Sequence, residues 1–158
     1  AIRTEDFLYI INFKPDRWPA GNPKGLDDYE MTPPSYDELQ HNTFTAYYDM
    51  DASPTKAWMI HHRNDGAVKP LFELAFSKRP YEELYDLKND KNYLNNIADN
   101  PDCSGIKCQL KARLMKILIE EKDPRICEDP CRFELPPYAG ELQDFQRNEL
   151  ISLLSKRK

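Results

Sequence analysis

The sequence predicts an α+β fold in which a small antiparallel sheet packs against helices on one face. Residues 7–13 are apolar on both faces, which is typical of a covered central strand. Residues 84–88 alternate between two faces and are followed by Asn89-Asp90, which indicates a second strand and a turn. Large apolar side chains recur at helical spacing between residues 104 and 121, which predicts one long amphipathic helix. We expect the strands to pair and this helix to cover one face of the sheet, leaving the other face for another domain.

Local signals place the remaining boundaries of these elements. The first strand region begins at Ile2, and we expect a turn at Glu5-Asp6 to break it. Pro80 prevents a helix from running into the second strand, and Pro124 ends the long helix. The apolar stripe of that helix consists of Ile106, Leu110, Leu114, Ile117 and Leu118.

The segment between the two strands is predicted to be an insertion. Residues 14–52 are rich in proline and glycine and read as a loop-rich surface segment, a kind of loop that is often functional or docked on another domain. Ser35–Glu38 has the spacing of a capping box, which favours a short helix. Ser53-Pro54 predicts a second helix that runs to Arg63, with Ser as N-cap and Pro at the first position. A third helix is expected over residues 69–78.

Bulk properties restrict the class of protein. A chain of 158 residues is one domain-sized unit, and 40% apolar with 31% charged residues is ordinary for a soluble globular domain. No apolar run approaches the roughly 20 residues of a membrane span. The net charge of −5 argues against nucleic-acid binding, which usually needs a basic field. The chain lacks a leader pattern and starts almost inside a strand, so we expect it to be a piece of a longer protein.

Four cysteines, spaced C-x4-C and C-x3-C, lie in the last third of the chain: Cys103, Cys108, Cys127 and Cys131. Two disulfides in an exported protein are the leading interpretation, and four cysteines permit three pairings. Zinc is the rival interpretation, although the spacings are looser than those of most structural zinc sites. In a cytosolic protein the thiols would stay reduced.

One stretch resembles a known family. Residues 79–87 read Arg-Pro-x-Glu-Glu-Leu-Tyr-Asp-Leu, and an acidic turn and the pattern Asn-x-Ala at Asn96 follow. This pattern resembles the C-terminal subdomain of type I sulfatases, and residues 3–10 resemble the strand that opens that subdomain. Residues 53–58 and 122–127 narrow the resemblance to N-sulfoglucosamine sulfohydrolases, which act on heparan-type glycans.

The resemblance covers nearly the whole chain except residues 14–51 and the last thirty. It implies that residues 1–158 are a single C-terminal subdomain with a sheet of four strands, an insertion at 14–52 and a helical extension at 141–158. It also implies an exported protein whose partners are the N-terminal catalytic domain of the same polypeptide and a sulfated glycan. The chain would shape the substrate cleft and stabilise the catalytic domain. An independent glycan- or protein-binding module is the alternative.

The resemblance also implies where the reaction takes place. Sulfatases use a formylglycine made from Cys or Ser in a Cys/Ser-x-Pro-x-Arg motif, beside a calcium ion. No cysteine or serine here stands in that motif, so we expect no catalytic residue, metal ligand or cofactor in this chain. Calcium and formylglycine would belong to the catalytic domain. The pair Asp27-Asp28 lies in a Pro/Gly-rich loop and is interpreted as two solvated acids.

The candidate substrate-binding residues are His61, His62, Arg63 and Lys56, all on or beside the second predicted helix. At i+4 spacing, His62 would lie over Trp58. Arginine suits bidentate contact with a sulfate or a carboxylate. The alternative is an ordinary helix end, where His and Arg meet the negative end of the helix dipole.

Overall fold

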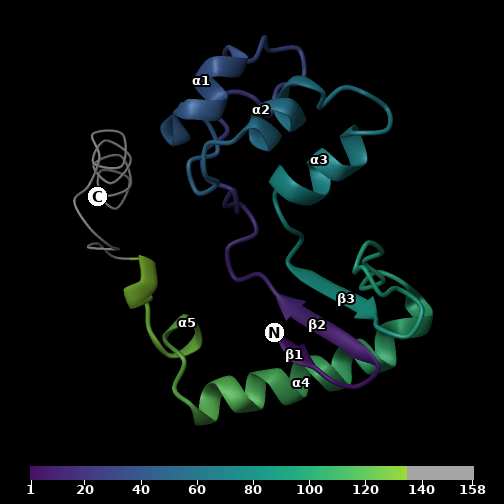
Figure 1. The fold of residues 1–158 in the computed structure, drawn as a ribbon. Helices are drawn as coiled ribbons and strands as arrows, with labels where there is room; N and C mark the ends of the chain where they lie inside the picture. Colours follow the sequence, from purple (N-terminus) through teal and green to yellow (C-terminus); the bar gives the residue numbers. More distant parts are fainter. Residues whose placement is uncertain (135–158) are drawn as a thin grey trace. The chain divides into compact units, whose positions relative to one another are not determined.

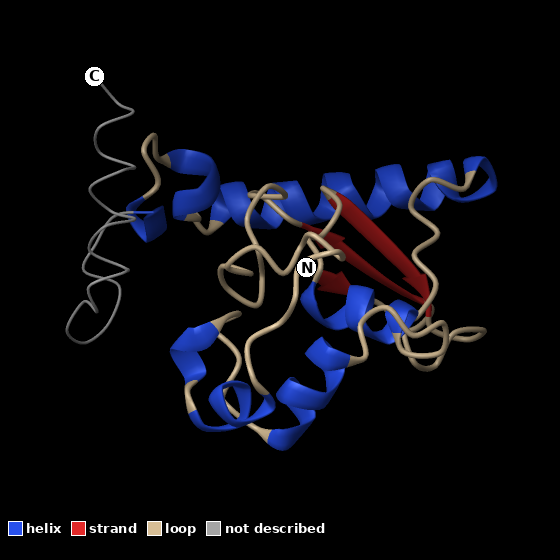
Figure 2. Cartoon of the chain, turned by 90° about the horizontal axis from the view of Figure 1, so that it is seen from above, coloured by secondary structure: helices blue, strands red, loops and turns tan. Residues whose placement is uncertain are grey.

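The computed structural model describes residues 1–134, and the predicted helix at 141–158 lies outside them. The architecture is α+β, with one small antiparallel sheet and several helices (Figure 2). The chain divides into two units, Ala1–Lys111 and Ala112–Lys158. None of the helices in the described range is both long and apolar enough to cross a membrane.

The sheet contains three strands in the order β1-β2-β3, formed by Ile2–Arg3, Phe7–Ile11 and Glu82–Asp86 (Figure 1). Both pairings are antiparallel, and Tyr9 lies opposite Leu84 in the β2–β3 register. The predicted turn at Glu5-Asp6 is confirmed, because the chain reverses there between β1 and β2. The predicted pairing of the two main strands is also confirmed.

The fourth strand that we expected is absent from the described residues, and the region after β3 shows why. The backbone N–H of Ile97 donates to the Leu84 carbonyl at 2.8 Å, so this segment does run beside β3. The N–H of Leu84, however, donates to the side-chain Oδ1 of Asn96 at 2.9 Å rather than to a backbone carbonyl. A side chain therefore replaces the backbone at this edge, and no regular ladder forms.

A helical insertion separates β2 from β3. It contains α1 (Tyr36–His41), α2 (Pro54–His61), α3 (Lys69–Phe76) and the short 3₁₀ helix η1 (Thr43–Thr45). In Figure 1 these helices gather beyond the end of β2 from which the chain leaves the sheet. The insertion has its own apolar core, which includes Leu26, Leu39, Tyr47, Ile60, Phe72 and Phe76. The predicted loop-rich segment thus contains α1 and contributes buried side chains.

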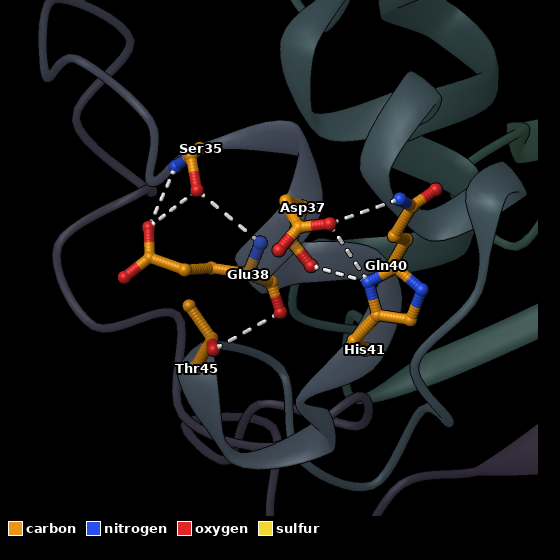
Figure 3. A network of polar contacts seen from close by, with 6 residues as sticks. All are labelled: Ser35, Asp37, Glu38, Gln40, His41 and Thr45. Carbon is orange, nitrogen blue, oxygen red and sulfur yellow. Dashed lines mark hydrogen bonds and ion pairs between the residues drawn. The ribbon is translucent and has the colours of Figure 1, made fainter.

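The start of α1 confirms the predicted capping box (Figure 3). The Ser35 Oγ accepts a hydrogen bond from the Glu38 N–H at 3.2 Å, and the Ser35 N–H donates to the Glu38 carboxylate at 2.9 Å. These bonds satisfy N–H groups that a helix start otherwise leaves unpaired. The Ser35 hydroxyl, which donates to the Glu38 carboxylate at 2.7 Å, and then the Ser35 N–H hold the pKa of the Glu38 carboxyl below its usual value. His41, in the last turn, lies 3.1 Å from the Asp37 carboxylate.

The long helix is confirmed as α4, Ser104–Glu120, which follows the 3₁₀ helix η2 (Pro101–Cys103). Three residues of its predicted stripe, Leu110, Leu114 and Leu118, are buried. At the sheet, the Lys111 Nζ lies 3.2 Å from the Glu82 carboxylate, which also accepts a hydrogen bond from the Tyr9 hydroxyl. These contacts hold the first half of α4 beside β2 and β3.

The described part of the second unit continues with α5 (Pro124–Cys127) and the 3₁₀ helix η3 (Arg132–Glu134), which pack against each other. Asp123 caps α5, since its Oδ1 accepts a hydrogen bond from the Arg125 N–H at 2.9 Å. The Arg125 guanidinium holds the pKa of the Asp123 carboxyl at about 2.

Candidate functional site

Helix α2 carries the candidate site, and its start is fixed by local chemistry. The Ser53 Oγ accepts a hydrogen bond from the Lys56 N–H at 3.1 Å, and Pro54 takes the first helical position, as predicted. The helix ends at His61 with His62 as its C-cap, two residues before the end we predicted. His61 and His62 therefore lie at the helix end, where the backbone turns away.

Trp58 and His62 stack on the surface of this helix. Their ring centroids are 4.6 Å apart with an interplanar angle of 29°, which confirms the predicted i+4 contact. The Asp65 carboxylate lies 2.7 Å from the His62 Nδ1 and fixes the orientation of the imidazole. Trp58 is 42% exposed, so part of the indole outside the His62 stack is accessible to a ligand. An exposed tryptophan of this kind is suited to contact with apolar or cationic faces.

His61 contributes a second aromatic contact beside the first. Its ring centroid lies 5.4 Å from that of Tyr36 on α1, and its Nε2 lies 3.0 Å from the Pro34 carbonyl. The Tyr36 hydroxyl donates to the carbonyl of Pro54, in the first turn of α2, at 3.1 Å. We call the exposed side chains Tyr36, Trp58, His61 and His62 the α2 aromatic face. Tyr36 is the member that the sequence did not indicate, because only tertiary packing brings α1 against α2.

The structure places Lys56 inside the insertion. The side chain is 1% exposed, and its Nζ donates to three carbonyls, those of Thr43 at 3.1 Å, Tyr47 at 3.2 Å and Met50 at 2.9 Å. Burial lowers the pKa of this ammonium, and the Asp51 carboxylate opposes the shift. All three ammonium protons are thus directed at backbone carbonyls, so Lys56 ties the 43–50 turn to α2.

Arg63 is also buried, at 2% exposed. Its Nη1 donates to the Ile60 carbonyl at 3.0 Å, and its Nη2 donates to the Met31 carbonyl and lies 3.5 Å from the Asp28 carbonyl. The guanidinium therefore holds the 28–31 loop against the end of α2. Of the four sequence-predicted residues, His61 and His62 are brought together on an accessible surface, whereas Lys56 and Arg63 lie beneath it.

Two other groups of polar side chains do not form a catalytic pair or a metal site. Glu82 and Glu83 point to opposite faces of the sheet, as expected of neighbouring strand residues, and Glu83 accepts hydrogen bonds from Asn12 at 2.7 Å and from the Tyr85 hydroxyl. All four cysteines are free thiols. Within residues 1–134, no cluster of three or more His, Cys, Asp or Glu is arranged to hold a metal ion.

The strand-and-turn stretch that carries the family resemblance has a defined geometry. The Asp86 Oδ1 accepts hydrogen bonds from the N–H groups of Lys88 at 2.9 Å and Asn89 at 3.1 Å, which closes the turn after β3. The Asn89 side chain adds a hydrogen bond to the Asp86 Oδ2 at 2.7 Å. After the turn, Asn96 returns to the β3 edge through Leu84. Asp86 and Asn96 therefore each bind backbone N–H groups, one at the turn and one at the strand edge.

Comparisons of the chain with protein-family models, with curated proteins and with solved structures found no match. The geometry of the α2 aromatic face and of the strand-and-turn stretch is therefore what bears on function.

Proposed function

We propose that this chain is the C-terminal part of a sulfatase, a sulfuric ester or sulfamate hydrolase that acts on sulfated glycans such as heparan-type sugars. The observation that carries the proposal is the arrangement after β3. The residues of the sulfatase-like pattern, Leu84, Asp86 and Asn96, are those that form the strand, close its turn and cover its edge. These roles explain why this combination of residue types would recur in a family of sheets.

The face of the sheet opposite Tyr9 supports docking to a catalytic domain. Tyr9 and Glu82 point to the side of α4, where Lys111 lies. Leu8 and Ile10 point to the other side and are only half-buried. Half-buried apolar side chains on a sheet face are suited to a further protein surface. In the proposed protein, that surface is the N-terminal catalytic domain, which would hold the formylglycine and calcium.

The α2 aromatic face supports contact with a glycan. Sugar rings present flat C–H faces, for which an exposed indole such as Trp58 is a suitable partner, and the imidazoles of His61 and His62 add polar groups at its rim. The contact does not rely on bulk charge, since the chain is acidic overall. An exported protein is the expected context of such a substrate.

The glycan contact is tested with Trp58 as its own reporter. The chain contains two tryptophans, so Trp18→Phe leaves Trp58 as the only indole. Titration of this variant with an N-sulfated heparan disaccharide should change the Trp58 emission. Trp58→Ala should weaken binding about tenfold, the size of a lost aromatic contact. The matched control is Trp18→Ala, since Trp18 contacts Lys78, a residue outside α2. If Trp58→Ala binds the disaccharide as tightly as the wild type, α2 does not form part of the glycan-binding site.

The enzyme assignment needs a separate experiment. The chain alone should give background rates with an aryl sulfate and with N-sulfated glucosamine, because it lacks the nucleophile motif. The coding sequence upstream of Ala1 should encode a Cys/Ser-x-Pro-x-Arg motif, and the joined protein should hydrolyse sulfate. Turnover by the chain alone that survives repurification would contradict the proposal. Tight glycan binding without such an upstream domain would favour the independent glycan-binding module, the alternative that exposed Trp58 supports.

A further inference from the structure

The long helix restricts which cysteines can form a disulfide. Cys103 ends η2, and Cys108 lies in α4, which begins directly at Ser104. Cys103 and Cys108 are five positions apart, and the rise of an α-helix over five positions separates their Cα atoms by about 7.5 Å along the axis alone. A disulfide needs Cα atoms less than about 7 Å apart. Cys103 and Cys108 therefore cannot be joined to each other while α4 is formed.

Cys127 and Cys131 are placed differently, because each directly precedes one end of a turn that runs from Glu128 to Arg132. The Glu128 carboxylate accepts hydrogen bonds from the Arg132 backbone N–H at 3.1 Å and from its Nε at 2.8 Å, which ties the two ends of the turn together. Cys127 is the last residue of α5, and its N–H donates to the Asp123 carbonyl at 3.1 Å.

The chain beyond the turn is held as well. The Cys131 carbonyl accepts a hydrogen bond from the Glu134 N–H at 2.9 Å, and η3 packs against α5. In an extended chain, residues four positions apart would be separated by about 13 Å. The bends at residues 129–130 and the Glu128–Arg132 hydrogen bonds fold the segment that links the two cysteines, so it is not extended.

We propose that Cys127 and Cys131 are a redox pair that closes to a single disulfide, while Cys103 and Cys108 stay as thiols. The oxidant is a low-molecular-weight disulfide such as oxidised glutathione. Cys127 is exposed and Cys131 is half-buried, so Cys127 meets the oxidant first.

The chemistry consists of two thiol–disulfide exchanges. The Cys127 thiolate attacks one sulfur of oxidised glutathione, which forms a mixed disulfide and releases one glutathione thiolate. The Cys131 thiolate then attacks the Cys127 sulfur and releases the second. The pair loses two electrons and two protons, and oxidised glutathione gains them as two thiols. The product is a covalently closed loop directly after α5.

Trypsin makes the proposal directly measurable. Cleavage after Arg125 and Arg132 releases residues 126–132, a peptide that contains Cys127 and Cys131. Cys103 and Cys108 fall in two other peptides, because Lys107 lies between them. The folded chain is equilibrated with oxidised and reduced glutathione, alkylated without reduction, and digested. Peptide 126–132 should be unalkylated and about 2 Da below its reduced mass, the two hydrogens of one disulfide. Cys103 and Cys108 should both be alkylated.

Serine variants complete the test. Cys127→Ser and Cys131→Ser should each abolish the linked peptide, whereas the matched controls Cys103→Ser and Cys108→Ser should leave it unchanged. Two alkyl labels on peptide 126–132 under oxidising conditions would overturn the proposal. A cross-link from Cys127 or Cys131 to Cys103, to Cys108 or to a second chain would overturn it too. The alkylation state of peptide 126–132 and the pattern of cross-links are measured on the wild-type chain, so they test the proposal even if a variant fails to fold.

Discussion

The Asn96 side chain covers part of the free edge of β3 by accepting the Leu84 backbone N–H at its Oδ1, at 2.9 Å. The same oxygen accepts the Ala98 N–H at 3.0 Å, and the Asn96 Nδ2 donates to the Glu82 carbonyl at 3.3 Å. An uncovered strand edge exposes unpaired backbone groups that invite pairing with other chains. One asparagine thus supplies both an acceptor and a donor that a fourth strand would otherwise supply.

Replacement of Asn96 with Ala should therefore destabilise the sheet. The change removes the acceptor of two N–H groups and the donor to one carbonyl, at a cost of about 1–2 kcal/mol in the free energy of unfolding. Urea unfolding measures the cost. The control is Asn95→Ala, whose side chain makes no hydrogen bond in the described chain and should change stability by less than about 0.5 kcal/mol. Equal midpoints for the two variants would contradict the role given to Asn96.

Alkaline pH should destabilise the fold through its buried tyrosines. Burial, followed by a hydrogen bond to Glu83, raises the pKa of Tyr85 to about 12, and burial together with Glu82 raises the pKa of Tyr9 further. An unfolded tyrosine loses its proton near pH 10, while the folded one keeps it. The folded state then binds more protons, so stability is retained below about pH 10 and falls as the pH rises above it.

The Tyr85→Phe variant tests this dependence. It should be less stable than the wild type near pH 7 by about 1 kcal/mol, since Glu83 loses a hydrogen-bond donor. Between about pH 10 and pH 12 the stability of the variant should fall less steeply than that of the wild type, because the variant has no Tyr85 hydroxyl to lose its proton on unfolding. Tyr9→Phe should act in the same way from the other face of the sheet. The assignment is wrong if the slope of stability against pH stays the same in both variants.

The sequence predicted the elements whose signals are local. The capping box at Ser35 and the N-cap at Ser53 were confirmed because a cap binds N–H groups within three residues of itself. The stripe of α4 was confirmed at Leu110, Leu114 and Leu118, which helical spacing places on one buried face. The pairing of β2 with β3 followed from two apolar segments that each need a partner.

The sequence could not predict which cations are buried. Arg63 was a candidate for anion contact because arginine suits bidentate contact with a sulfate or a carboxylate, and Lys56 was a second cation on the same helix. Their partners are backbone carbonyls from the 43–50 turn and the 28–31 loop. Every residue type has a backbone carbonyl, so the sequence does not reveal which ones will accept a hydrogen bond. The α2 aromatic face was predicted only in part, since Tyr36 reaches it from α1. The fourth strand is missing because the Asn96 side chain takes the place of a backbone partner at the edge of β3. The spacing of apolar residues in the sequence does not reveal such a replacement.

The stripe of α4 offers a direct test of core packing. Leu114 is 4% exposed, and Leu114→Ala should leave a cavity that costs about 2–5 kcal/mol in the free energy of unfolding. Glu120→Ala removes an exposed side chain whose one ion pair, to Lys116, spans 3.8 Å, so it should cost less than about 0.5 kcal/mol. Thermal unfolding of the two variants checks the difference. If they melt at the same temperature, the stripe does not carry the packing assigned to it.

The buried ammonium of Lys56 should contribute strongly to the stability of the insertion. Lys56→Met keeps the length and apolar stem of the side chain but removes the donor to Thr43, Tyr47 and Met50. Replacing a buried ion pair with apolar residues can be neutral when both partners change. Here the partners are backbone carbonyls that no substitution removes, so the carbonyls of Thr43 and Met50 lose their ammonium donor, while that of Tyr47 keeps the Met50 N–H at 2.9 Å.

We therefore expect Lys56→Met to lower the free energy of unfolding by about 2–4 kcal/mol, since each charged hydrogen bond contributes about 1.5–3 kcal/mol and the 43–50 turn can partly relax towards water. Lys91→Met is the matched control, because Lys91 is exposed and has no hydrogen bond or ion pair within residues 1–134. Amide hydrogen exchange should show faster exchange at the N–H groups of residues 43–50 in Lys56→Met but not in the control. If exchange there is unchanged while global stability falls, Lys56 stabilises α2 rather than the turn.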